Sequence, residues 1–402
     1  MPSLPSSRST PVSSPENDPL RFRPSNPPPN SPPVSTPELL NYLWIPFLLA
    51  LSKEFVVAKA SVLPSSTSPS LPNELGDRLS DSPSIPGCPA PDAKLNYNPV
   101  IGILSHPGDG ASGRLKNVSG VSYIAASYVK FVESAGARVV PLFYNETQET
   151  LFEKLSLVNG LLFTGGRIKS GRYFNTVQAL FRKAREMNDN GRHFPIYAIC
   201  LGFELLSIII SEEKQILDEF NCANQGSTLQ FTENVDIEGT VFQRFPRELL
   251  KKLQTDCLAM QVHSYGITPS RFQENKNLSR FFRVLTTSKD QSGKEYVSTV
   301  QARNYPITGF QWHPEKNAFE WGKSMIPHSE DAVQVTQHVA NYFIRLAKAT
   351  CFEIEARKSS NRPSLQKVLD NLIYNYSPTY CGKAGYGYDE VYIFEQKIKS
   401  KV

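Results

Sequence analysis

The stretch PIYAICLGFELLSIII, residues 195–210, has the form of a buried strand that runs into an apolar helix. Its first five residues make a short apolar run, and a helix is predicted from Leu201, so Cys200 stands at the turn between the two. Gly202 permits the tight backbone approach that such a turn needs. The pattern predicts an α/β fold in which the thiol is lifted out of the packed layers.

This position favours a reactive cysteine. The first N–H groups of the following helix are unpaired and the helix dipole favours an anion, so both are expected to lower the pKa of the Cys200 thiol. The N–H of Leu201 would then point towards an oxyanion that forms beside the sulfur. Free cysteine also packs as a small hydrophobe, and the strand and helix alone leave both interpretations open.

A second run, TGFQWHPEKNAFEW at residues 308–321, supplies groups that a thiol nucleophile needs. Thr308 to Trp312 is expected to be a short strand, and His313 and Glu315 follow it, so an imidazole and a carboxylate leave one strand end together. A thiol, a base and an orienting acid are the parts of acyl transfer through a covalent thioester.

Five motifs together resemble the gamma-glutamyl hydrolases of the plant type, within the class I glutamine amidotransferase-like superfamily. They are FTGG at 163–166, CLGFELL at 200–206, STLQF at 227–231, GFQWHPEKNAFEWG at 309–322 and NLIYNYSPTY at 371–380. The resemblance runs from about Asn98 to about Glu395. It implies a cysteine hydrolase that cleaves gamma-glutamyl bonds of folylpoly-gamma-glutamates, a small-molecule substrate, without a metal or another cofactor.

The resemblance also implies roles for individual residues. Cys200 matches the nucleophile, His313 the catalytic histidine and Glu315 the acid of the superfamily's HPE motif. Gly165 and Gly166, which end the strand LLFTGG, match the half of the oxyanion hole that would work with Leu201.

Three further positions are candidates for substrate binding. His263, in QVHSYG, matches a histidine that family members place near the substrate, and Glu204, in CLGFE, is a second pocket residue. Arg167 stands where plant relatives commonly have an aromatic residue, and it begins a basic run with Lys169 and Arg172. These cations either grip the carboxylates of an acidic substrate or form a solvated loop.

Two other functions remain open. A glutaminase-type amidotransferase would need a synthase partner, and the signal-like segment and the CLGFE helix argue against it. A folate-polyglutamate-binding pseudoenzyme is suggested by the atypical Arg167 and Ile199, whereas the retained Cys200, His313 and Glu315 argue against it.

Apolar runs that alternate with helical patterns predict a three-layer, flavodoxin-like α/β sandwich with a mostly parallel central sheet, of the class I glutamine amidotransferase-like type. The active site is expected at the carboxyl ends of the strands. A strand-rich region is expected at 227–300, and an aromatic segment from Leu372 is expected to cover the surface near the site or a subunit interface. Other strands are predicted at 100–104, 138–142, 160–163 and 195–199, and helices at 122–135, 151–157, 176–188 and 331–349.

The region before the catalytic domain, which is placed at 96–396, divides into three parts. Residues 1–37 are rich in Pro and Ser and are expected to be disordered. Residues 38–60 resemble a signal peptide with an A-x-A type site that ends at Ala60, although such a segment normally begins a chain. Residues 61–95 are expected to be a linker or propeptide.

A signal peptide would direct the chain to the vacuole or the extracellular space. It would also expose the sequons that begin at Asn117, Asn145, Asn277 and Asn375 to glycosylation. The apolar run at 39–51 is too short for a stable membrane anchor. The net charge of +5 is small for 402 residues, and without a basic and aromatic stripe nucleic-acid binding is not indicated. A homodimer is expected from the family.

Overall fold

The computed structural model describes residues 96–110, 115, 120–348, 364–382 and 387–395. The segments interpreted from sequence as a disordered extension (1–37), a signal peptide (38–60) and a linker (61–95) lie outside the described residues. The sequon at Asn117 also lies outside them.

An eight-stranded sheet forms the centre of the described domain. Its order is β4 (Arg138–Leu142), β1 (Val100–Leu104), β5 (Gly160–Phe163), β6 (Ile196–Ile199), β12 (Ile307–Phe310), β11 (Glu295–Ala302), β10 (Phe282–Lys289) and β8 (Gln230–Phe231). The first five strands are parallel neighbours, and β11, β10 and β8 extend the sheet with antiparallel pairs. The mostly parallel central sheet predicted from the alternating pattern is therefore confirmed.

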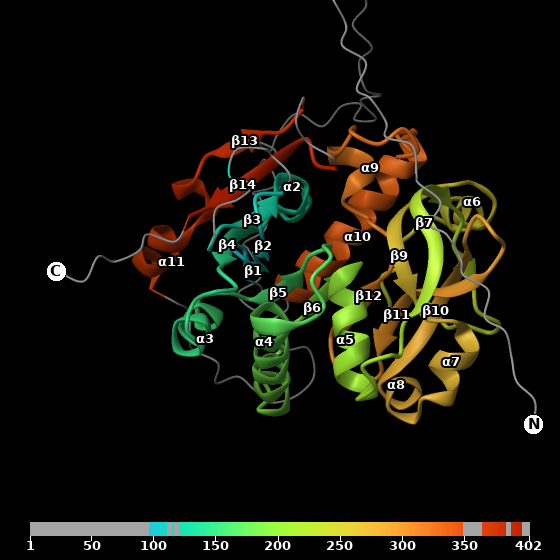
Figure 1. Cartoon of the computed structure of the whole chain (residues 1–402), viewed down its shortest axis with the longest axis horizontal. Helices are drawn as coiled ribbons and strands as arrows, with labels where there is room; N and C mark the ends of the chain where they lie inside the picture. The colour runs from blue at the N-terminus through green and yellow to red at the C-terminus, as the bar shows by residue number, and fades with distance from the viewer. Residues whose placement is uncertain (1–95, 111–114, 116–119, 349–363, 383–386, 396–402) are drawn as a thin grey trace, which may run out of the picture. The chain divides into compact units, whose positions relative to one another are not determined.

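Helices cover both faces of this sheet, as Figure 1 shows. On one face, α2 (Ala126–Ser134) and α10 (Glu330–Lys348) pack with Tyr197 and Ile199 of β6. On the other face, α3 (Gln148–Ser156), α4 (Gly171–Asp189) and α5 (Leu201–Ser211) pack with Ile196 and Ala198. Successive residues of a strand point to opposite faces, so apolar residues throughout β6 serve two cores and produce three layers.

Two smaller sheets flank the centre. One is antiparallel and has the order β13 (Pro378–Tyr380), β14 (Glu390–Phe394), β3 (Ser122–Ala125) and β2 (His106–Pro107). The other pairs β7 (Asp218–Ser227) with β9 (Ala259–Gly266). The remaining helices are α6 (Arg247–Thr255), α7 (Pro269–Glu274), α8 (Lys276–Phe281), α9 (Lys316–Phe319), α11 (Leu365–Asn371) and the short 3-10 helix Ile373–Asn375.

One predicted helix was partly wrong. The helix expected at 122–135 starts only at Ala126, because residues 122–125 form β3 and pair with β14 from the end of the chain. This pairing also shows where the aromatic C-terminal segment lies: it is joined to the strand that leads directly into α2. Among the described residues, no helix is both long and apolar enough to cross a membrane.

Candidate active site

Three adjacent parallel strands bring the predicted site together at their carboxyl ends. Gly165 and Gly166 follow β5, Cys200 follows β6 and His313 follows β12. A Cβ atom placed on Gly165 would stand 2.8 Å from His313 Cε1 and 3.5 Å from the Cβ of Cys200. The glycine turn therefore lies close to both the Cys200 side chain and the imidazole, and a side chain at position 165 would collide with the histidine.

The turn at Cys200 has the strained backbone of a nucleophile elbow. Its φ of 52° and ψ of −108° are unusual for a non-glycine residue. Two backbone hydrogen bonds hold it, from the Cys200 N–H to the Phe310 carbonyl at 2.6 Å and from the Gly202 N–H to the Thr164 carbonyl at 3.2 Å. A Cβ atom on Gly202 would lie 2.6 Å from the Phe163 carbonyl oxygen, so glycine is required for this close approach.

His313 is oriented by Glu315. Its Nδ1 lies 2.7 Å from Glu315 Oε1, while its Nε2 is buried and has no hydrogen-bond partner among the described residues. Burial lowers the pKa of His313, and Glu315 opposes this effect. Burial would raise the pKa of Glu315, but His313 and Lys316 outweigh it and hold that pKa below its usual value. The imidazole is therefore neutral near pH 7, with Nδ1–H donating to a carboxylate and Nε2 ready to accept a proton.

The pKa of the Cys200 thiol is shifted in the opposite direction to the one expected from the sequence. Burial, followed by Glu204 and Glu315, raises the pKa of Cys200, and the Leu201 N–H and Lys169 oppose this only in part. The predicted lowering was wrong in direction because the side chain is only 4% exposed and two carboxylates act on it. The resting site holds a protonated thiol near a neutral imidazole.

The three candidate oxyanion-hole N–H groups differ in whether they already donate a hydrogen bond. The Gly165 N–H donates to the hydroxyl of Tyr128 at 2.9 Å, so in this structure it is occupied. The Leu201 N–H faces the sulfur, and the Gly166 N–H makes no hydrogen bond with the described residues. Tyr128 was missed from the sequence, because a tyrosine on the buried face of a helix looks like any other core aromatic residue. Its hydroxyl also lies 3.5 Å from His313 Nδ1.

His263 lies on β9, beside the nucleophile. The preceding carbonyl, that of Val262, lies 3.8 Å from Cys200 Sγ. The His263 ring contacts the Tyr265 carbonyl through Nδ1 at 2.8 Å and Gln261 Oε1 through Nε2 at 3.1 Å. Burial lowers the pKa of His263 to about 3, so this imidazole is neutral.

The structure separates the three cations of the basic run. Arg167 is exposed, and its backbone N–H donates to His106 Nε2 at 3.2 Å. Arg172 donates to the backbone carbonyls of Asn145 and Glu146. Lys169 turns back to the site and forms an ion pair of 2.9 Å with Glu204, which is buried on α5. Burial raises the pKa of Glu204, and Lys169 opposes this effect.

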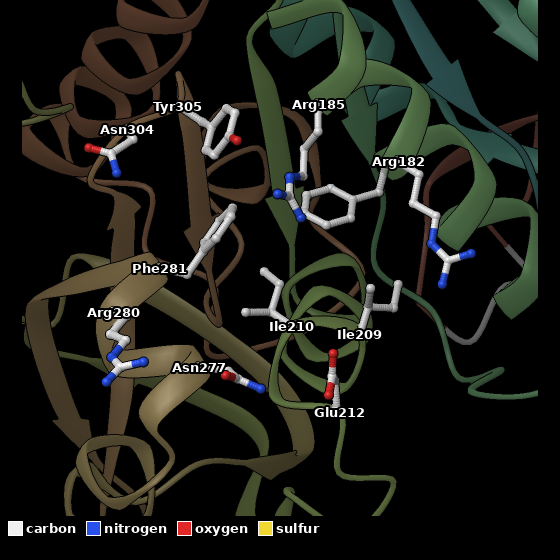
Figure 2. Close-up of a pocket in the computed structure, with 11 residues that line it drawn as sticks. Arg182, Arg185, Ile209, Ile210, Glu212, Asn277, Arg280, Phe281, Asn304 and Tyr305 are labelled. Atoms are coloured by element: carbon white, nitrogen blue, oxygen red, sulfur yellow. The ribbon is translucent and has the colours of Figure 1, made fainter. Parts of the chain in front are cut away.

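A pocket of about 380 Å³ lies elsewhere on the domain (Figure 2). It is lined by Ile209, Ile210 and Glu212 at the end of α5, together with residues of α4 and α8. Cys200 precedes the other end of this helix of 11 residues, about 16 Å away at 1.5 Å per residue. None of the candidate catalytic residues lines this pocket.

An α/β fold with a cysteine at a strand-to-helix turn and an oriented His–Glu pair defines a hydrolase of the cysteine-nucleophile class. A family described as peptidase C26 matches residues 99–315. The chain belongs to the peptidase C26 family. The family and enzyme class indicated by the motifs are thereby confirmed.

Relatives cover nearly the same length. Gamma-glutamyl hydrolase 2 of Arabidopsis thaliana is 59% identical over 359 residues, which are 89% of this chain and 98% of that protein. Gamma-glutamyl hydrolase 1 of the same plant is 64% identical over 81% of this chain and 90% of its own length. Human gamma-glutamyl hydrolase is 35% identical over 76% and 92%. A solved glutamine amidotransferase from Thermotoga maritima matches 63% of this chain and 99% of its own, with 12% identity and a TM-score of 0.37.

Proposed function

We propose that this enzyme hydrolyses gamma-glutamyl bonds of folylpolyglutamates through a thioester on Cys200. The observation that carries the proposal is the pairing of His313 with Glu315, which leaves Nε2 without a partner in the part of the chain described. The names of the relatives support the bond type, since proteins of 53–64% identity from two plants are called gamma-glutamyl hydrolases, one of them as a probable assignment.

In the first half of the reaction, Nε2 of His313 takes the proton of the Cys200 thiol as the sulfur attacks the gamma-carbonyl carbon. The carbonyl oxygen becomes an oxyanion, for which the N–H groups of Leu201 and Gly166 are the available donors. The imidazolium, paired with Glu315, then passes its proton to the leaving amine, and the C–N bond breaks to leave a thioester.

In the second half, a water molecule attacks the thioester carbonyl and His313 accepts the proton of that water. The C–S bond breaks, the product leaves as a carboxylic acid, and the proton returns from the imidazolium to the sulfur. A positioned base contributes about 10²–10⁴-fold, so His313→Ala should lower kcat by that factor.

The decisive experiment offers a pentaglutamyl folate to the whole chain and to Cys200→Ala, with the exposed Cys257→Ala as the matched control. We expect release of glutamate or polyglutamate by the unsubstituted chain and by Cys257→Ala, and none by Cys200→Ala. Product lengths distinguish endo from exo cleavage. Binding without cleavage by the unsubstituted chain would reject this function and favour the folate-binding pseudoenzyme.

We also propose that the protein enters the secretory pathway, towards the vacuole or the extracellular space. The apolar run and the A-x-A site within residues 38–60 support this proposal. Fusion of residues 1–95 to a fluorescent reporter tests it: a signal in the vacuole or the medium is expected, and a reporter that stays in the cytosol would contradict it.

A further inference from the structure

Lys169 is the one cation of the basic run whose side chain reaches the nucleophile. Its Nζ lies 2.9 Å from Glu204 Oε2 and 4.3 Å from the centre of the Tyr265 ring. Glu204 is one helical turn after Cys200, and Tyr265 is three residues after Val262, whose carbonyl contacts the sulfur. Elements that flank the thiol on two sides therefore hold the ammonium group.

The pair is only partly enclosed. The Lys169 side chain is 27% exposed, whereas that of Glu204 is 4% exposed. An ammonium group has three N–H donors, and the described contacts are one ion pair and one aromatic face. The Lys169 ammonium group can therefore donate a further hydrogen bond to a ligand, whereas the Glu204 carboxylate beside it is buried.

The acyl half of a gamma-glutamyl substrate needs such a cation. Its α-carboxylate is joined to the scissile gamma-carbonyl by a short aliphatic chain, so it must lie close to Cys200 when the carbonyl does. Glu204 would repel it there. Arg167 is exposed, and its charge acts on Tyr123 and Lys323, whereas the charge of Lys169 acts on the Cys200 thiol. Arg172 donates to two backbone carbonyls. Lys169 is the remaining member of the run.

We propose that Lys169 binds the α-carboxylate of the glutamyl residue whose gamma-amide is cleaved, while Glu204 and Tyr265 hold the ammonium in place. This assignment rests on the proposed function. A purely structural alternative is that Lys169 only neutralises Glu204.

Two substrates distinguish binding of the α-carboxylate by Lys169 from simple neutralisation of Glu204. One is 4-aminobenzoyl-diglutamate, and the other has the α-carboxylate of its first glutamate replaced by a carboxamide. The ratio of kcat/KM for the two is measured in the unsubstituted chain, Lys169→Met, Lys169→Arg and Lys183→Met. The last is a matched control, because Lys183 forms a Lys–Glu ion pair of the same 2.9 Å on α4.

We expect the unsubstituted chain and Lys183→Met to prefer the carboxylate by about 10–100-fold, the usual range for a hydrogen bond between charged groups. Lys169→Met should lose this preference. Lys169→Arg, which keeps the positive charge, should retain part of it. Each variant is its own reference, so any general loss of activity affects both substrates and cancels in the ratio.

Other outcomes overturn the assignment. If Lys169→Met loses activity on both substrates equally and keeps the preference, the lysine only neutralises Glu204. If the unsubstituted chain cleaves both substrates without preference, Lys169 does not bind the carboxylate although the proposed function stands. If the unsubstituted chain cleaves neither, the proposed function fails and the Lys169 assignment fails with it.

Discussion

Glu315→Gln tests whether the charge of Glu315 stabilises the imidazolium that forms on His313 during turnover. Glu315 Oε1 lies 2.7 Å from His313 Nδ1, and both side chains are buried. The isosteric amide also offers an oxygen to Nδ1–H, so the substitution removes charge with little change of shape. A hydrogen bond to a charged group contributes about 1.5–3 kcal/mol. Because the imidazolium forms only during turnover, the loss should appear in kcat, as a fall of about 10–150-fold.

The pH profile should move in a direction that a general loss of structure would not produce. Glu315 raises the pKa of His313 against the lowering by burial, so its removal should lower that pKa further. His313 accepts a proton only when neutral, and kcat/KM is therefore lost as pH falls through this pKa. The variant should be slower at its optimum, with its acid limb at lower pH.

The assay is kcat and kcat/KM on a polyglutamyl folate from pH 4 to pH 8. Glu146→Gln is the control, because this carboxylate is also paired with a basic side chain, that of Lys154 at 2.6 Å, but does not act on His313. It should leave the acid limb in place. An acid limb of Glu315→Gln that stays unchanged or moves to higher pH would refute the reasoning.

Three further predictions concern the resting protein. In a Cys257→Ser background, alkylation of Cys200 by iodoacetamide should rise about tenfold per pH unit up to pH 9, because the thiol is protonated; a rate independent of pH would indicate a preformed ion pair. Burial lowers the pKa of His106 to about 4, so the unfolded chain binds a proton at this residue at higher pH than the folded protein does. His106 should therefore account for about 2 kcal/mol of the stability that the protein loses between pH 7 and pH 5. In denaturant titrations, His106→Gln should lose that much less stability over this range. Gly202→Ala should cost about 1–3 kcal/mol and lower Tm, whereas Gly322→Ala, with open space around its Cβ position, should not.

The parallel half of the fold could be predicted because its signals are local. The strands β1, β4 and β5 have the predicted bounds, and β6 differs by one residue. Each is an apolar run between turn residues, and strands buried on both faces need no distant information to be recognised. The convergence of Cys200 with His313 also follows from such signals, since parallel strands end at the same edge of a sheet.

The features that were missed depend on distant partners. Residues 122–125 have a helical pattern, but they pair with β14, more than 250 residues later. The direction of the Cys200 pKa shift depends on burial and on Glu204 and Glu315 acting together, and local helix geometry contains neither quantity. Tyr128 belongs to the site only because α2 packs on the sheet so that its hydroxyl accepts the N–H of Gly165, in the turn after β5.

The charges of the site explain why a protonated thiol suits this chemistry. Transfer of the proton to His313 creates an imidazolium, which Glu315 stabilises, and a thiolate, which Glu204 and Glu315 destabilise. A thiolate formed without substrate is therefore unfavourable. When the sulfur attacks a bound carbonyl, its negative charge passes to the carbonyl oxygen, away from the sulfur and towards backbone N–H donors. Proton transfer and attack are thus favourable only together, so the cysteine becomes nucleophilic where a substrate amide is already in place and reacts slowly with other electrophiles at neutral pH.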